Sequence, residues 1–250
     1  MNEDKFKGVV LRSTQISDNT NLLTVLTDTR GKKLITCHGA KKLTGRSMSA
    51  VQPFCFSEMT VNEKNGRLTL KEATLIESFF ELHTDLLAAS LGMYMLELVS
   101  ESAREEENET ELLQLLLNSL FALCRKLCPV DQIKAAFELR LLKTLGSAPS
   151  DFYCAHCGTP VLDGGAAYSV SEGGLLCYKC SDGNTQGFLN AGAREALHYI
   201  LRCPPKRIFS FTISEKCLHE LSTFSQECIL YFFEHNFETL KFYNRMKNES

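Results

Sequence analysis

The first 80 residues alternate between short apolar runs and turn-forming residues, a pattern typical of β-strands. Five runs have this character, at residues 6–12, 21–27, 33–37, 51–61 and 67–76. Asn65-Gly66, between the last two runs, is a strong signal for a two-residue hairpin turn. Five short strands predict a small closed barrel. The OB-fold is the commonest five-stranded barrel, although strand count alone also fits an SH3-like barrel.

From residue 81 onward, apolar residues recur at helical spacing instead. The pattern predicts helices at residues 82–100, 111–127, 132–145, 191–201 and 215–237. Thr110, Asp131 and Ser214 are expected to cap three of them, and Gly146 is expected to end the third. Residues 101–111 contain six glutamates. We interpret that run as a solvated helix end and connector, with an acidic docking site as the alternative.

These patterns predict an α+β protein with four parts. Residues 1–80 form the barrel, and residues 81–149 form a helical bundle with short links. Residues 150–188 form a cysteine module inserted in the helical part, and residues 189–250 supply C-terminal helices that pack on the bundle.

The cysteine module contains two pairs of cysteines with metal-site spacing. Each pair is a CxxC, and nineteen residues separate Cys154 and Cys157 from Cys177 and Cys180. A tight turn can place two thiolates on one cation, and a loop of this length lets the second pair complete a tetrahedron. The spacing therefore predicts a structural Zn²⁺ site with four thiolate ligands.

Several kinds of chemistry fit this module poorly. A redox CxxC requires a helix after its first cysteine, whereas Pro160, Gly164 and Gly165 follow Cys157 here. A catalytic zinc keeps one coordination position open for water, and four thiolates leave none. The sequence also lacks the common nucleotide-binding, hydrolase and metalloprotease motifs. We therefore expect no enzymatic activity.

Charge is distributed unevenly along the chain. Residues 1–80 hold 12 Lys and Arg against 8 Asp and Glu, and residues 81–250 hold 15 against 22. The barrel segment places cations at its first turn and on a hydroxyl-rich loop, where Lys and Arg can neutralise phosphates. The candidate DNA-binding residues are Arg30, Lys32, Lys33, Lys41, Lys42 and Arg46. A solvated, solubilising loop is the alternative interpretation.

Base stacking has little support in this segment. Residues 1–80 contain no Trp or Tyr, and Phe54 and Phe56 are expected to share a strand face in the barrel core. Binding to nucleic acid is therefore expected to depend on phosphates, and so to be salt-sensitive and nearly independent of base sequence.

The compartment is predicted from the cysteines and the first residues. The odd count of eleven cysteines favours a reducing environment over a secreted disulfide framework. The chain opens with polar residues, and its richest apolar stretch, at residues 112–124, is shorter than the ~20 residues of a membrane span. We expect a cytoplasmic protein with no membrane partner.

Short motifs in the N-terminal segment follow one another in a particular order. They are Phe6-Lys-Gly-Val-Val-Leu-Arg12, Thr27-Asp-Thr-Arg-Gly-Lys32, His38-Gly-Ala-Lys-Lys42 with Arg46-Ser47, and Val51-Gln-Pro-Phe54. In this order they resemble the N-terminal domain of the RecO family of bacterial recombination mediators. The helical segment and the paired cysteines fit the rest of that family. Lys41-Lys42 and Val51 stand where the family usually has more arginine and a leucine.

The resemblance implies an OB-fold N-terminal domain, a helical C-terminal domain that carries the zinc module, and no catalytic turnover. It also implies binding of single- and double-stranded DNA and annealing of complementary strands. The partners that it implies are RecR, the single-strand-binding protein and RecF. With them, the protein would help to load the recombinase during DNA repair, at the bacterial nucleoid.

Two other classes of function remain open from the sequence. One is a zinc-containing protein adaptor that does not bind DNA, for which any DNA association depends weakly on salt. The other is a thiol oxidoreductase with a reactive Cys154 and no bound zinc.

Overall fold

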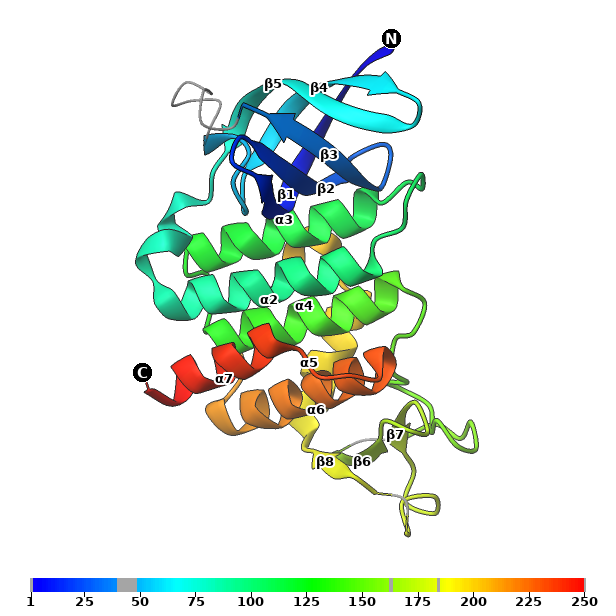
Figure 1. Cartoon of the computed structure of the whole chain (residues 1–250). Helices are drawn as coiled ribbons and strands as arrows, with labels where there is room; N and C mark the ends of the chain where they lie inside the picture. Colours follow the sequence, from blue (N-terminus) through cyan, green and yellow to red (C-terminus); the bar gives the residue numbers. More distant parts are fainter. Residues whose placement is uncertain (1, 40–48, 162–163, 184, 250) are drawn as a thin grey trace. The chain divides into compact units, whose positions relative to one another are not determined.

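The computed structural model describes residues 2–39, 49–161, 164–183 and 185–249 (Figure 1). The chain divides into two compact units, of which the first is Met1–Cys124 with Thr239–Ser250 and the second is Arg125–Glu238. The predicted bundle at residues 81–149 therefore has residues in both units, and the division into four parts stays a prediction. No helix among the described residues is long and apolar enough to cross a membrane.

Five strands close into a barrel in the first unit. They are β1 (Asn2–Ser17), β2 (Thr20–Thr27), β3 (Lys32–His38), β4 (Phe56–Lys64) and β5 (Arg67–Glu77). Their order is β1-β2-β3-β5-β4, and β4 pairs with β1 to close the barrel. The β3–β5 pair is parallel and the other pairs are antiparallel. The predicted five-stranded barrel of the OB type is confirmed.

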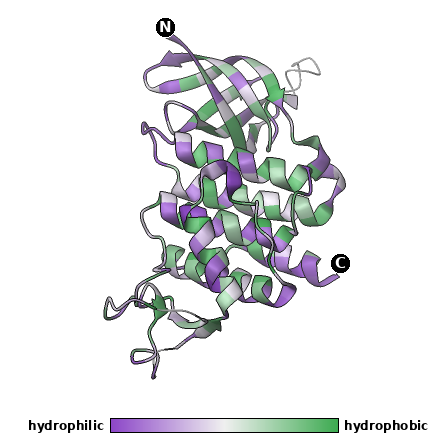
Figure 2. Ribbon diagram, turned by 180° about the vertical axis from the view of Figure 1, so that it is seen from behind, coloured by the Kyte–Doolittle hydropathy of each residue, from purple (hydrophilic) through white to green (hydrophobic). Residues whose placement is uncertain are grey.

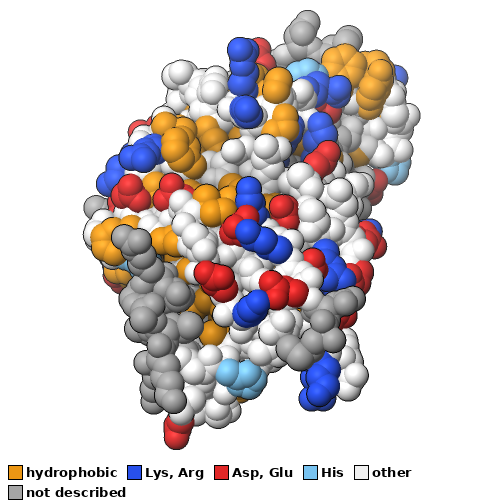
Figure 3. Space-filling model, turned by 90° about the horizontal axis from the view of Figure 1, so that it is seen from above, with side chains coloured by type: hydrophobic (Ala, Val, Ile, Leu, Met, Phe, Trp, Pro, Cys, Tyr) orange, Lys and Arg blue, Asp and Glu red, His pale blue; other side chains and the backbone are white. Residues whose placement is uncertain are grey.

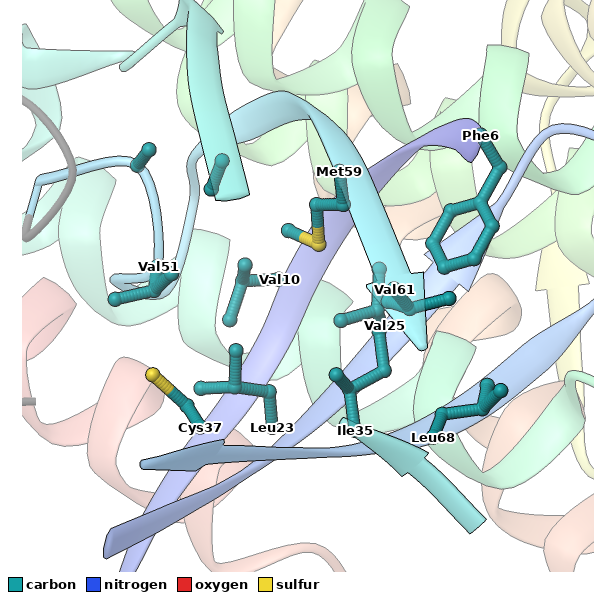
Figure 4. Close-up of a cluster of buried hydrophobic side chains, with 12 residues drawn as sticks. Phe6, Val10, Leu23, Val25, Ile35, Cys37, Val51, Met59, Val61 and Leu68 are labelled. Carbon is teal, nitrogen blue, oxygen red and sulfur yellow. The ribbon is translucent and has the colours of Figure 1, made fainter. Parts of the chain in front are cut away.

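The barrel core follows from the period-two alternation of its strands. Along β3, Lys33, Ile35 and Cys37 are buried while Leu34 and His38 are exposed. Figure 2 shows the same alternation of hydrophobic and hydrophilic residues along the barrel strands. The inward side chains fill the barrel (Figure 4), and they are Phe6, Val10, Leu23, Val25, Ile35, Cys37, Ala50, Val51, Met59, Val61, Leu68 and Ala73.

The predicted hairpin turn between β4 and β5 is confirmed. Asn65 and Gly66 both have positive φ, 52° and 72°. These angles belong to a type I′ turn, whose twist matches that of the two flanking strands.

The prediction of a strand at residues 51–61 was wrong in its first part. Residues 51–54 form turns, and β4 begins at Phe56. Phe54 has φ 70°, its N–H donates to Val10 O at 3.2 Å, and Val10 N–H donates to Cys55 O at 3.0 Å. Phe54 is therefore not on a β4 face with Phe56. Its ring instead packs on Gly92, where an added Cβ would lie 2.8 Å from Phe54 Cε1.

The helices of the first unit are η2 (Phe80–Thr84), α2 (Leu86–Ser102), α3 (Thr110–Cys124) and α7 (Glu238–Glu249). The predicted helix at 82–100 is divided because Asp85 caps α2, accepting from Ala88 N–H at 3.0 Å. Thr110 is not the cap of α3 but its first residue, and Asn108 Oδ1 accepts its N–H at 3.0 Å. The helix ends at Cys124 rather than at residue 127.

The second unit contains α4 (Val130–Thr144), α5 (Ala191–Arg202), η3 (Pro205–Arg207) and α6 (Glu215–Phe233). It also contains a small sheet of order β7-β6-β8, made of β6 (Ala166–Ser169), β7 (Gly174–Leu176) and β8 (Gly187–Leu189). The caps predicted at Ser214 and Gly146 are confirmed, whereas Pro129 and not Asp131 holds the N-cap position of α4. The predicted helix at 215–237 ends at Phe233, because Glu234 takes φ 58°.

A buried ion pair lies where α4 packs on α6. Lys134 Nζ and Glu138 Oε2 are 3.0 Å apart, with side chains 1% and 0% exposed. The same carboxylate oxygen accepts the hydroxyl of Ser225 on α6 at 2.6 Å. A buried charge pair of this kind sets which helix faces meet, because any other arrangement would leave the charges unpaired.

Gly31, at the turn between β2 and β3, lies close against the backbone of residues 104–107. It forms a bridge with Glu105, and an added Cβ would lie 2.2 Å from Arg104 O. Its φ of 62° also favours glycine. The segment between α2 and α3, residues 103–109, thus rests directly on the turn; it is called the acidic connector below.

We expect Gly31→Ala to destabilise the protein more than Gly66→Ala. Both substitutions place Ala at positive φ, which costs about 1–2 kcal/mol. An added Cβ at Gly66 has no neighbour within 4 Å, whereas at Gly31 it meets backbone. The overlap should add roughly 1–3 kcal/mol. Urea unfolding followed by circular dichroism measures the difference, and equal losses for the two variants would show that the close contact is not needed.

Candidate metal centre and nucleic-acid interface

The four cysteines predicted as metal ligands lie together in the second unit. The Sγ atoms of Cys154, Cys157, Cys177 and Cys180 are all within 4.8 Å of one another. Cys157 Sγ and Cys177 Sγ are 3.7 Å apart. A tetrahedral thiolate site with metal–sulfur bonds of ~2.3 Å places its sulfurs ~3.8 Å apart. The donor set and its spacing therefore fit one tetrahedral metal ion.

Two turns position these sulfurs. In the first pair, Cys154 N–H donates to Thr159 O at 2.8 Å and Gly158 N–H donates to Cys154 O at 2.9 Å. The second pair follows β7, and Cys180 N–H donates to Cys177 O at 3.0 Å. A hydrogen bond from Ala155 N–H to Leu175 O, 2.8 Å, holds the first turn against β7. Neither pair begins a helix, so the setting that a redox CxxC requires is not present.

The surroundings of the first pair favour thiolates. Hydrogen bonds from the Thr159 hydroxyl and backbone lower the pKa of Cys157 to about 6. For Cys154, burial acts in the opposite direction, but backbone N–H groups of Cys177, Cys157 and His156 outweigh it and lower the pKa. Since metal ions bind the thiolate form, both effects prepare the site for a cation.

His156 lies between the first two cysteines, yet its ring is engaged elsewhere. Nδ1 is 2.8 Å from Glu172 Oε2, and this hydrogen bond raises the pKa of the imidazole. Four sulfurs already complete a tetrahedron, so the histidine is not needed as a ligand.

We expect His156→Ala to keep its bound metal and Cys157→Ala to lose it. The first change removes only the contact with Glu172, whereas the second leaves three ligands and an open position. Elemental analysis of each purified variant, per mole of chain, measures this. Loss of metal from the histidine variant, or its retention by the cysteine variant, would contradict a site with four thiolates.

The three candidate cations at the β2–β3 turn are held by other parts of the first unit. Arg30 forms ion pairs with Asp4 and, at 3.8 Å each, with Glu63 and Glu106. Lys33 is buried and paired with the Glu106 carboxylate, and Lys32 Nζ donates to Ser100 O at 2.7 Å. Burial and then the charge of Arg30 lower the pKa of Lys33. The sequence did not anticipate these contacts.

The other three candidates, Lys41, Lys42 and Arg46, lie outside the described residues. The chain enters that segment directly after β3 and Gly39. Their role in DNA binding stays a prediction.

Four further cations are exposed on the barrel, and within the described residues their side chains form no ion pair. They are Lys7, Arg12, Lys64 and Arg67. Lys64 and Arg67 are cross-strand partners on either side of the hairpin turn. Two like charges opposite each other are unfavourable unless an anion is nearby, so the pair marks this turn as a candidate contact for phosphate.

The outer face of β1, β2 and β3 brings Arg12 next to uncharged side chains. One row across the strands is Arg12, Thr24 and Leu34, and the next is Thr14, Leu22 and Thr36. Leu34 is 52% exposed. Strands 2 and 3 form the usual oligonucleotide-binding face of OB-folds. Arg12 was not among the residues predicted to bind DNA. β1 is buried continuously from Gly8 to Leu11 and its register shifts between Val10 and Arg12, so alternation along the strand does not single Arg12 out.

Figure 3 shows how charge is arranged on one face of the molecule. Lys and Arg side chains are interspersed there with Asp and Glu side chains, with hydrophobic groups between them. On this face, favourable contacts with a polyanion therefore depend on individual cations rather than on one continuous basic surface.

Comparisons with known proteins agree with the architecture. The family model described as "Recombination protein O N terminal" matches residues 1–79, and "Recombination protein O C terminal" matches residues 83–241. A protein named DNA repair protein RecO from Acetivibrio thermocellus is 32% identical over 244 residues, 97% of this chain and 96% of that protein. The protein of the same name from Desulforamulus reducens is 30% identical over 243 residues, covering 97% and 94%.

Proposed function

The chain belongs to the RecO family, and from this membership and the exposed barrel face we propose that it is a recombination mediator that binds and anneals DNA strands. Its relatives carry the name of DNA repair proteins, and its role lies in DNA repair and recombination. In the proposed function, the barrel binds single- and double-stranded DNA, and no catalytic turnover is involved.

The observation that carries the proposal is the outer face of β1, β2 and β3. Arg12 is exposed and free of ion pairs there within the described residues, in a row with Thr24 and Leu34. An unpaired guanidinium can bind phosphate oxygens, and neighbouring hydroxyls can donate to them. Because residues 1–80 contain no Trp or Tyr, phosphate contacts rather than base stacking dominate the proposed binding.

Charge neutralisation explains how such a face promotes annealing. Two complementary strands repel each other through their phosphates, and bound cations reduce this repulsion so that the bases can pair. The remainder of the chain is acidic, with 15 Lys and Arg against 22 Asp and Glu in residues 81–250. That excess disfavours DNA contact outside the barrel and leaves other surfaces available to proteins.

Family membership also supports specific partners. We propose that the chain acts with RecR, the single-strand-binding protein and RecF, and assists loading of the recombinase at gaps. A protein with this role works on the chromosome, so we propose a cytoplasmic, nucleoid-associated location.

We further propose that the four cysteines bind Zn²⁺ as a structural ion. Four thiolates leave no coordination position for water or substrate, so the ion would supply folding energy rather than catalysis. The strands of this region are only three or four residues long, and such a small sheet needs an additional constraint. The elemental analysis described above identifies the metal, and an iron-containing or metal-free protein would contradict this assignment.

Replacing Arg12 by Ala should weaken DNA binding and reduce its salt dependence. Losing one phosphate contact lowers the slope of log K against log salt by ~0.7 for a single strand. Fluorescence anisotropy with a labelled oligonucleotide at several salt concentrations measures the slope. Arg207→Ala, an exposed arginine in η3, is the matched control. A wild-type slope near zero would instead support the protein adaptor, and equal slopes for the two variants would exclude Arg12 as a contact.

Replacing Lys41, Lys42 and Arg46 together by Glu should strongly reduce annealing. The change reverses three charges in the loop predicted to contact phosphates, so the loop would repel the strands. Annealing of two complementary labelled oligonucleotides at low and moderate salt measures the effect. The control is the variant with Gln at the same three positions, which removes the positive charges without adding negative ones. Its annealing rate is expected to lie between those of the wild type and the Glu variant. Unchanged annealing in the Glu variant would argue against the loop as a binding element.

A further inference from the structure

The acidic connector, residues 103–109, lies over the cationic turn between β2 and β3. Lys32 N–H donates to Arg104 O at 2.8 Å, and Gly31 forms a bridge with Glu105. At the end of the connector, the hydroxyl of Thr110 donates to Asp28 O at 3.0 Å. Backbone contacts on both sides of the turn thus position the connector.

One carboxylate of the connector, that of Glu106, lies where an anion would bind to the cations of the turn. Glu106 pairs with Lys33, whose side chain is only 8% exposed, and its Oε2 lies 3.8 Å from Arg30 Nε. Carboxylates and phosphates are recognised by the same cationic groups with similar geometry. A pocket of about 190 Å³ adjoins this pair, and its lining includes Arg30, Lys32, Lys33, Glu105 and Glu106. One carboxylate therefore bridges two cations at the edge of an open pocket.

Two features make Glu106 easy to displace: its side chain is largely exposed, and its backbone has an unfavourable conformation. Glu106 has φ 59°, a region that L-residues other than Asn, Asp and Gly rarely adopt. Its side chain is 67% exposed, so its departure exposes little new surface. By contrast, Lys33 lies on the buried side of β3, in the same row as Ile35 and Cys37. The Glu106 carboxylate can therefore be replaced by another anion while Arg30 and Lys33 stay in place.

We propose that the acidic connector is an internal competitor for nucleic-acid phosphate, and that Arg30 and Lys33 form a phosphate site which Glu106 fills in the absence of DNA. The inference rests on the proposed function and extends it. DNA binds first at the unpaired cations of the barrel and then displaces the connector. Any interaction that holds the displaced connector strengthens DNA binding by linkage.

The test compares Glu106→Gln with Glu111→Gln, which makes the same charge change at an exposed position in the first turn of α3. Each protein is titrated with a single-stranded oligonucleotide at several salt concentrations. The first variant should bind several-fold more tightly at every salt concentration, because no carboxylate competes with phosphate for Arg30 and Lys33. The second should keep an affinity close to that of the wild type, because it removes charge without freeing a cation.

A second measurement follows the connector itself in the wild-type protein. The amide of Lys32 donates to Arg104 O, so its hydrogen exchange should speed up when DNA displaces the connector. Amides inside β4 serve as the internal control, because the barrel remains folded.

The outcomes separate this inference from the proposed function. If wild-type protein binds DNA, but the two variants behave alike and the Lys32 amide keeps its protection, the competitor is excluded and the DNA-binding function stands. If neither the wild type nor either variant binds DNA, both proposals fail.

Discussion

The arrangement of charges around the β2–β3 turn depends on the contact between Gly31 and the acidic connector in the DNA-free protein. Because Gly31 has no Cβ, Arg104 O can approach the β2–β3 turn closely enough for the bridge to Glu105. The bridge fixes the chain that leads from α2 to α3 and so attaches both helices to the barrel. It also brings Glu105 and Glu106 beside Arg30, Lys32 and Lys33, and this determines which charges of the barrel remain available.

Pairing, rather than net charge, decides the electrostatics of the barrel. Among the described cations of residues 1–80, four have carboxylate partners: Lys5 pairs with Glu58, Lys71 with Glu3, and both Arg30 and Lys33 with the acidic connector. The pairs of Lys5 and Lys71 are exposed and contribute little stability, so their main effect is to reduce the local positive potential, whereas Lys33 is buried beside its partner. Within the described residues, the exposed barrel cations without an ion pair are Lys7, Arg12, Lys64 and Arg67.

The second unit uses a different constraint. Its sheet has strands of three or four residues, too short to be stable through backbone pairing alone. Two turns bring four sulfurs to the spacing of a tetrahedral site, and the hydrogen bond from Ala155 to Leu175 joins the first turn to β7. A metal ion bound here would connect segments that are about twenty residues apart in sequence, which is the role that a hydrophobic core has in the barrel.

Local patterns in the sequence were sufficient for the elements and for the four sulfurs. The alternation of apolar residues predicted five strands, Asn65-Gly66 predicted their hairpin, and the spacing of Cys154, Cys157, Cys177 and Cys180 predicted the cluster. All of these signals depend on residues close together in the chain or on fixed ligand chemistry.

Tertiary structure decided what each charged or aromatic residue does. Lys33 and Glu106 are 73 positions apart, and only the folded chain shows that they pair. Phe54 lies outside the predicted strand, and its ring packs on Gly92 of α2. Lys134 is buried because it pairs with Glu138, whose carboxylate also accepts the hydroxyl of Ser225 on α6. The physical reason is the same in each case: burial and pairing are set by partners distant in sequence, which no local pattern contains.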